Sequence, residues 1–321
     1  MRYVIYGAGA VGGVIGGSLV HHGHEVALLA RGEHLAALRA GGLQLETPDA
    51  TVTLAIPVAG DPADLPVTNE DVVILATKGQ DTLAAVEQLA ALAPAVPVVC
   101  AQNGVENERV ALRRLPRVYG MSVFLPATHL APGVVQANGS PALGILDLGC
   151  YPSGTDDLCE RLAGDLTASG FSSRPDPAIM RHKYAKLLLN LGNAVEAASG
   201  ASARQGDLVG QAQAEARRCL EAAGIDVAPP EEAQTRREGV LGLRPVNGQR
   251  RQGGSSWQSL ARTTGRIETD YLNGEIVLLG RLHGIPTPVN DMLQRVANRL
   301  ARDQQPPGSL TAEDLLAEIN S

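Results

Sequence analysis

The segment Gly7-Ala8-Gly9-Ala10-Val11-Gly12 is a G-x-G-x-x-G motif, and its surroundings decide the fold. The apolar run Arg2–Tyr6 before it predicts a buried strand, and Val11–His22 after it predicts a helix. In this context the first glycine permits a tight turn, the second lets the backbone approach a pyrophosphate, and the third lets the helix pack on the strand. The helix N-terminus adds N–H donors and a partial positive charge. The segment therefore predicts a dinucleotide-binding turn; the alternative is a glycine-rich structural turn without a ligand.

The first third of the chain continues this alternation of strands and helices. Further elements are predicted at Glu25–Ala30, Val72–Ala76 and Val96–Cys100 as strands, at His34–Ala40 and Gln80–Leu92 as helices, and at Val134–Ala137 and Ala142–Asp147 as short extra strands. Nearly continuous apolar strands that alternate with helices indicate a parallel sheet covered on both faces. We therefore expect an α/β, Rossmann-type domain at the N-terminus.

A turn-rich break at Ser172–Pro177 marks the expected domain boundary, because its two prolines disfavour a continuing helix. Residues 1–174 are predicted to bind the dinucleotide, and residues 175–321 to form an all-α domain. A length of 321 residues fits two domains of about 150 residues each. Helices are expected at Ile179–Ser199, Leu208–Ala223, Glu231–Val240, Ile267–His283, Pro288–Arg302 and Thr311–Ile319, with a polar loop at Arg244–Ser256.

Composition excludes several classes of protein. The net charge of −7 argues against a general nucleic-acid binder, which needs a basic surface. No apolar run reaches the roughly 18 residues that span a bilayer, and the start of the chain does not read as a signal peptide. The scattered cysteines favour a reduced, cytoplasmic compartment and predict neither a disulfide framework nor a metal site. They are Cys100, Cys150, Cys159 and Cys219.

Lysine is rare in this chain. Only three of the 27 basic residues are lysines, namely Lys78, Lys183 and Lys186. Unlike arginine, a lysine amine can be tuned to release a proton near neutral pH, so each is a candidate for chemistry; chance retention is the alternative. Lys183 precedes Lys186 by three residues on one predicted helix and lies about 60° around its axis. We expect Lys183 to tolerate alanine far better than Lys186.

The end of the second strand carries information about the cofactor. Arg31 follows it, at the place where an NAD enzyme usually has an acidic residue for the ribose 2′-hydroxyl. A guanidinium instead binds a 2′-phosphate, often through two hydrogen bonds. The sequence therefore predicts NADP. The alternative is that Arg31 is an ordinary surface residue and that Glu33 takes the NAD role.

Polar residues line one side of the helix after the boundary. Lys186, Asn190 and Asn193 lie within about 60° of one another on a helical surface. On an otherwise apolar helix such a stripe suits a polar pocket, although an exposed polar face is the alternative. Further along, Ser256 is followed twelve residues later by Glu268, which taken singly would be a solvated charge.

Taken together, these residues resemble the ketopantoate reductase (2-dehydropantoate 2-reductase) family over roughly residues 1–302. In that family the N-terminal domain binds NADPH and a helical domain supplies the substrate pocket. Besides the glycine turn, the shared features are Arg31, Lys78, Asn103-Gly104, Lys186-Leu187, Asn190, Ser255-Ser256, Glu268, Asp270 and Asn273-Gly274.

The resemblance implies roles for the candidate site residues of the helical domain. Lys186 would be the general acid that protonates the developing alkoxide and stabilises its charge. Asn190 and Ser256 would hold the polar groups of the substrate, and the stripe adds Asn193 to them. Glu268, also assigned to catalysis, would accept hydrogen bonds where cofactor and substrate meet.

Two residues of the N-terminal domain receive roles in the same way. Asn103 would lie beside the nicotinamide and contact the substrate as well. Lys78 would lie near the phosphate or ribose end of the cofactor. No metal-binding residue is predicted.

The expected function is NADPH-dependent reduction of a 2-oxo acid to a 2-hydroxy acid, above all ketopantoate to pantoate, as in pantothenate biosynthesis. Three positions depart from the family pattern, at Ala194, Arg204 and Leu260, and they leave open a sister reductase that acts on another oxo acid or carbonyl. A non-catalytic NADP-sensing protein is the alternative of another class. The expected partner is a small-molecule oxo acid, with no nucleic acid or membrane. The helical domain and the tail after Pro307 could support a homodimer.

Overall fold

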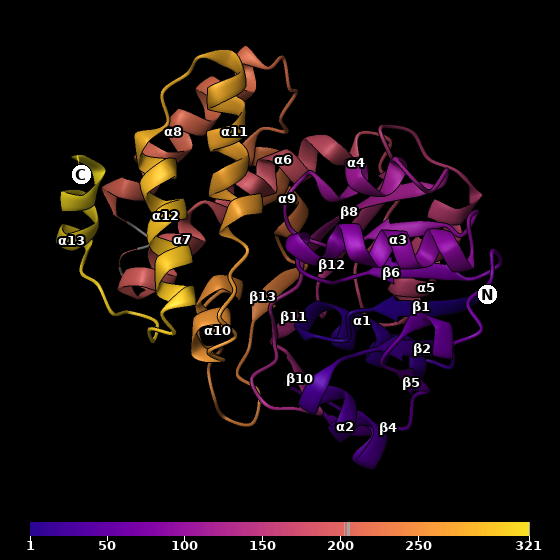
Figure 1. Cartoon of the computed structure of the whole chain (residues 1–321). Coiled ribbons are helices and arrows are strands. Elements are labelled where there is room, and N and C mark those ends of the chain that lie inside the picture. The colour runs from indigo at the N-terminus through magenta and orange to yellow at the C-terminus, as the bar shows by residue number, and fades with distance from the viewer. Residues whose placement is uncertain (202, 204–205, 321) are drawn as a thin grey trace. The chain divides into compact units, whose positions relative to one another are not determined.

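The computed structural model describes residues 1–201, 203 and 206–320, and the chain divides into two compact units. Unit 1 comprises Met1–Lys183 and Pro230–Arg251, and unit 2 comprises Tyr184–Pro229 and Gln252–Ser321. Figure 1 shows unit 1 with its sheet and unit 2 with its helices. The functional division between residues 1–174 and 175–321 stays a prediction.

A seven-stranded sheet forms the centre of unit 1, in the order β12-β8-β7-β6-β1-β2-β5. All neighbouring pairs are parallel except β12 and β8. The four apolar strands predicted in the first hundred residues are all present, so the predicted α/β class is confirmed. The strands are β1 (Arg2–Tyr6), β2 (Glu25–Leu29), β5 (Val58–Ala59), β6 (Val72–Leu75), β7 (Val98–Cys100), β8 (Val118–Phe124) and β12 (Ile145–Cys150).

Helices cover both faces of this sheet, and β1 shows why its strands are apolar throughout. Tyr3 and Ile5 face one core, formed with α1 and α5, whereas Val4 and Tyr6 face the other, formed with α3 and α4. A strand buried on both faces needs no polar alternation. The helices are α1 (Ala10–His21), α2 (Gly32–Gly41), α3 (Thr82–Leu92), α4 (Asn107–Leu112) and α5 (Asp157–Ala168), with short 3-10 turns η1 (Pro62–Asp64) and η2 (Gly79–Asp81).

A second, four-stranded sheet packs against the opposite side of α1, which explains the glycines of that helix. A Cβ at Gly16 would lie 2.9 Å from Ile5 Cγ1, and one at Gly13 would lie 2.7 Å from Val135 Cγ1 in the second sheet. Larger residues would therefore push the helix off one sheet or the other. The order is β4-β3-β10-β9, with β3 (Leu43–Glu46), β4 (Thr51–Leu54), β9 (Ala127–Thr128) and the predicted strand β10 (Val134–Ala137).

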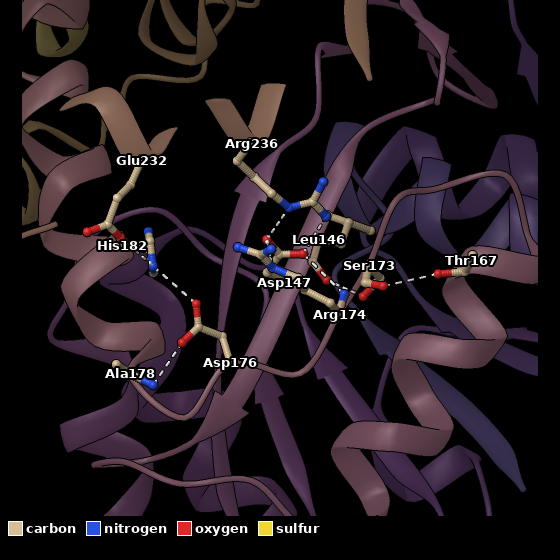
Figure 2. Close-up of polar contacts among 10 residues, drawn as sticks. All are labelled: Leu146, Asp147, Thr167, Ser173, Arg174, Asp176, Ala178, His182, Glu232 and Arg236. Carbon is tan, nitrogen blue, oxygen red and sulfur yellow. Dashed lines mark hydrogen bonds and ion pairs between the residues drawn. The ribbon is translucent and has the colours of Figure 1, made fainter. Parts of the chain in front are cut away.

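Residues 230–251 join unit 1, although they follow two helices of unit 2 along the chain. Figure 2 shows Arg236 of α9 (Pro230–Arg237) against Asp147 of β12; its Nε and one terminal amine both donate to the carboxylate at 2.7 Å. Glu232 lies with His182 and Asp176 in the same view. Next, β13 (Leu241–Leu243) pairs antiparallel with β11 (Gly139–Pro141). No strand is predicted here from the sequence, because three residues paired to a distant segment leave no local pattern.

In unit 2 the regular elements that the structure describes are all helical, which confirms the predicted all-α class. The predicted helix Ile267–His283 is wrong in one respect: it divides at Leu272, whose backbone (φ −118°, ψ −89°) leaves the helical region. None of the helices in the described part of the chain has the length and hydrophobicity to cross a bilayer. The elements are α6 (Ile179–Asn190, continuous from unit 1), α7 (Gly192–Ser199), α8 (Asp207–Ala222), α10 (Ser255–Ala261), η4 (Thr269–Tyr271), α11 (Asn273–His283), α12 (Pro288–Arg302), α13 (Ala312–Ala317) and η5 (Glu318–Asn320).

Candidate active site

The predicted cofactor residues of unit 1 all follow the carboxyl ends of neighbouring parallel strands. The next strand of this sheet along the chain, β2, lies on one side of β1, and the later strand β6 lies on the other side. The strand order therefore reverses at β1, and such a switch point is where open α/β sheets bind nucleotides. The residues concerned are Gly7 after β1, Arg31 after β2, Lys78 after β6 and Asn103 after β7.

The glycine turn is pressed against the end of β6. Gly7 has φ +101°, and its N–H donates to the Leu29 carbonyl at 3.1 Å. A Cβ at Gly7 would lie 2.9 Å from the Thr77 nitrogen, and one at Gly12 would lie 2.2 Å from the Gly7 oxygen. The packing of the chain itself therefore requires glycine at both positions, as the motif predicts.

Gly9 differs from these two glycines. A Cβ there would meet no described heavy atom within 4 Å, so the described packing does not account for glycine at this position. Gly9 is the N-cap of α1, and in the described part of the chain no side chain caps this helix and no acidic residue stands in its first turn. A Cβ would instead fill space in front of the helix N-terminus, where backbone N–H groups bind phosphate. The turn thus fits the pyrophosphate of a dinucleotide.

Arg31 is exposed at the same edge of the sheet, as the N-cap of α2. Burial raises the pKa of the Tyr6 phenol, and the charge and hydrogen bonding of Arg31 oppose that rise. The guanidinium therefore lies beside the end of β1. Glu33, the alternative reader of the ribose, is also exposed and stands in the first turn of α2.

A buried hydrogen-bonded network connects the ends of β6 and β7. Gln102 Nε2 donates to the Thr77 carbonyl at 3.0 Å and to Thr82 Oγ1 at 2.9 Å. Thr82 donates to Asn107, whose amide donates to the Asn103 carbonyl at 2.8 Å. The network fixes the segments that carry Lys78 and Asn103, both half-buried. Sequence reasoning did not predict this network, although polar Gln102, two residues after an apolar strand, was a usable signal.

Lys183 is buried, so its replacement by alanine is expected to lower stability, whereas the expectation that turnover depends on Lys186 and not on Lys183 stays a prediction. Its Nζ lies 2.5 Å from Glu108 Oε1 and donates to the carbonyls of Gln102 at 3.1 Å and Met121 at 3.3 Å. Burial also raises the pKa of the adjacent Cys100 thiol well above its ordinary value, which Lys183 opposes. The helical spacing placed Lys183 off the polar stripe but could not show what it packs against.

In unit 2, α6 and α7 carry the predicted stripe of Lys186, Asn190 and Asn193. The two helices meet at Leu191, which keeps right-handed helical backbone (φ −59°, ψ −30°) and donates to the Leu187 carbonyl at 3.2 Å. The helical spacing therefore continues through the junction. Both asparagines are buried, and Lys186 is half-buried.

Asn273 joins this junction to the segment that follows Glu268. Its Nδ2 donates to the Leu191 carbonyl at 3.3 Å and to Asn290 Oδ1 at 3.1 Å, and its Oδ1 accepts from Thr269. Glu268, itself buried, stands directly before Thr269. The structure of unit 2 thus brings the Glu268 segment against the turn of helix between the two predicted asparagines.

Glu196 makes a comparable link to the segment that carries Ser256. The buried carboxylate of Glu196 accepts the Gly254 N–H at 3.2 Å, and Gly254 is the N-cap of α10. Ser256 is buried in the first turn of that helix. Sequence reasoning missed Glu196, because a single acidic residue on a predicted helix is usually solvated.

Two of the three departures from the family pattern are described. Ala194 and Leu260 are both buried, so each is an apolar residue packed inside the protein at a position where the resemblance expects a polar side chain. Arg204 lies outside the described residues.

The structure brings together two cysteines that are scattered in the sequence. The side-chain ligand atoms of Cys150, Asp156 and Cys159 lie within 4.8 Å of one another. Asp156 caps α5 by accepting the N–H groups of Leu158 and Cys159, and it also accepts the Tyr119 hydroxyl. Burial raises the pKa of the Cys159 thiol to about 12. These contacts explain the cluster as the start of a helix, and the expected absence of a metal stays a prediction.

Family models match both halves of the chain. The model of Ketopantoate reductase PanE/ApbA matches residues 3–153, and the model of its C-terminal part matches residues 178–301. The chain belongs to the ketopantoate reductase family. It is accordingly an oxidoreductase, and the cofactor of the family is NADPH.

Individual relatives agree with this placement. A 2-dehydropantoate 2-reductase of Halobacterium salinarum is 30% identical, over 94% of this ketopantoate reductase family member and 100% of the relative. A 2-dehydropantoate 2-reductase of Pyrococcus horikoshii is 28% identical, over 91% of this chain and 95% of the relative. A solved ketopantoate reductase of Ralstonia eutropha has a TM-score of 0.79 and 29% identity over 95% of this chain and 100% of its own. A solved D-mandelate dehydrogenase shares the fold, with a TM-score of 0.79. Its identity is 23%, over 95% of this chain and 99% of its own.

Proposed function

We propose that this protein reduces 2-dehydropantoate (ketopantoate) to pantoate with NADPH, the reaction used in pantothenate biosynthesis. The observation that carries the proposal is the match to both family models, supported by a relative of that name at 30% identity over nearly the whole chain. The compartment would be the cytoplasm and the partner a small-molecule oxo acid, with no nucleic acid or membrane; a homodimer belongs to the proposal as well.

The proposed chemistry divides between the cofactor and one side chain. NADPH, when bound, supplies the hydride that converts the keto carbon to an alcohol carbon. The Lys186 ammonium donates a proton to the former carbonyl oxygen and stabilises the negative charge that develops there. A non-catalytic NADP sensor would need neither Lys186 nor Glu268, so their presence favours an enzyme.

The remaining site residues bind and orient. By the resemblance and the helical stripe, Asn190, Asn193 and Ser256 would hold the carboxylate and hydroxyl of the oxo acid, and all three side chains are buried. Glu268 would accept hydrogen bonds from cofactor and substrate. In unit 1, Asn103 would contact the nicotinamide and the substrate. Lys78 would lie near the phosphate or ribose end of the cofactor.

Substrate identity is the first prediction to test. In an NADPH-oxidation assay against a panel of 2-oxo acids, ketopantoate should give the highest kcat/KM, at about 10⁴ M⁻¹s⁻¹ or more. The second candidate function is a sister reductase, and the buried apolar Ala194 and Leu260 are the observations that favour it. A more apolar oxo acid that clearly outperforms ketopantoate would replace the proposed substrate with that one.

The second prediction concerns the choice between NADPH and NADH. Arg31→Ala should weaken NADPH binding by about 1.5–3 kcal/mol, the contribution of hydrogen bonds to a charged group, and leave NADH binding almost unchanged. Titration calorimetry with both cofactors measures this. Glu33→Ala is the matched control two residues away and should affect neither. Equal losses for the two cofactors with Arg31→Ala would show that Arg31 does not bind the 2′-phosphate, and a loss of NADH binding with Glu33→Ala would show that Glu33 binds the ribose.

A further inference from the structure

His34, on the first turn of α2, contacts the backbone of the glycine turn. Its Nε2 lies 2.8 Å from the Ala8 carbonyl oxygen, between the first two glycines of the motif. Its Nδ1 accepts the Gly133 N–H at 2.9 Å, from the segment just before β10. The ring of His129 packs beside it, with 4.3 Å between centroids. One imidazole thus links the turn, α2 and the second sheet.

These two contacts assign the tautomer of His34. A carbonyl oxygen can only accept a hydrogen bond, so Nε2 carries a hydrogen and donates to Ala8. A backbone N–H can only donate, so Nδ1 carries none and accepts from Gly133. His34 is therefore a neutral imidazole protonated on Nε2, and both ring nitrogens have partners.

The contact with Ala8 controls the next amide. The peptide unit between Ala8 and Gly9 is planar and trans, so its C=O and N–H point in opposite directions. A carbonyl held toward His34 therefore turns the Gly9 N–H away from His34. Glycine at position 9 restrains this peptide very little, because it accepts backbone conformations that other residues avoid. Backbone hydrogen bonds hold the Ala8 N–H and the Gly9 carbonyl, and His34 adds a contact to the Ala8 carbonyl between them.

We propose that His34 is a positioning residue for the cofactor: it holds the Ala8–Gly9 peptide so that the Gly9 N–H faces a phosphate of the dinucleotide. The inference rests on the proposed function only in that this turn binds NADPH. It does not depend on which oxo acid is reduced. His34 acts through Ala8 and needs no contact with the cofactor itself.

Two variants separate hydrogen bonding from packing. His34→Phe keeps a ring against His129 but removes both hydrogen bonds, and it should raise the Kd for NADPH about 5- to 30-fold. The kcat at saturating NADPH should stay within about threefold of wild type, since bound cofactor restores the turn. His34→Gln, whose amide both donates and accepts, should recover most of the affinity. The Kd is measured by titration calorimetry, and thermal melting checks the fold.

The matched control is His22, whose Nδ1 lies 2.8 Å from the Ser18 carbonyl at the other end of α1. His22→Phe should leave the Kd unchanged. An unchanged Kd in His34→Phe would overturn the proposal, as would a loss that His34→Gln does not restore or that falls equally on kcat. If wild-type protein binds NADPH but does not reduce ketopantoate, the proposed substrate is wrong, whereas the binding measurements still decide the role of His34.

Discussion

Replacing Lys186 with alanine is expected to lower kcat for ketopantoate reduction at least about a hundredfold. Hydride transfer places a full negative charge on the former carbonyl oxygen, and water is a poor proton donor at neutral pH. A general acid contributes about 10²–10⁴-fold, and loss of its charge adds to the effect. NADPH affinity should be retained, because the proposed phosphate-binding turn belongs to unit 1 and Lys186 to unit 2. Steady-state kinetics and cofactor titration on the same preparation measure both quantities.

Arg217→Ala is the control for this prediction. Arg217 is an exposed cation on α8 of the same unit, and its removal alters net charge by the same amount without touching a predicted site residue. Its kcat should stay close to wild type. If Lys186→Ala has a near wild-type kcat, or loses kcat no more than Arg217→Ala does, Lys186 is not the proton donor.

The cofactor half of the site could be predicted from sequence because its signal is local. A strand, three glycines and a helix lie within about twenty residues, and each glycine requirement follows from the turn itself. The structure adds that Gly7 and Gly12 are required by packing against β6 and β1, whereas Gly9 is not. The motif alone cannot show which glycines are required by packing, since all three positions contain the same residue.

The parts that the sequence analysis missed depend on contacts between distant segments. The strand β3, which was not predicted, pairs with the predicted strand β10, and β11 pairs with β13, which was not predicted, each across about ninety residues or more. Their short lengths leave little periodicity to read. The same holds for the site: Asn273 could be recognised through the resemblance, but its contact with the Leu191 carbonyl follows only from the packing of α11 on the α6–α7 junction.

Lys183 gives the largest expected effect on stability. Lys183→Ala should lower the free energy of unfolding by about 3–5 kcal/mol, the usual cost of breaking a buried ion pair by removing one partner. The reason is that the Glu108 carboxylate, which has no exposed surface, would lose the ammonium 2.5 Å away. Three backbone carbonyls would lose their donor as well. Urea unfolding of wild type and variant measures the difference.

The double variant Lys183→Met/Glu108→Leu distinguishes this explanation from a simple loss of packing. It removes both charges together and fills similar volume, so most of the lost stability should return. A cost below about 1 kcal/mol for Lys183→Ala, or a double variant no more stable than the single one, would contradict the buried pair. Activity separates the two lysines of α6: folded Lys183→Met should retain turnover, since its ammonium faces Glu108 and strand carbonyls, whereas Lys186→Ala should lose turnover while its stability changes little.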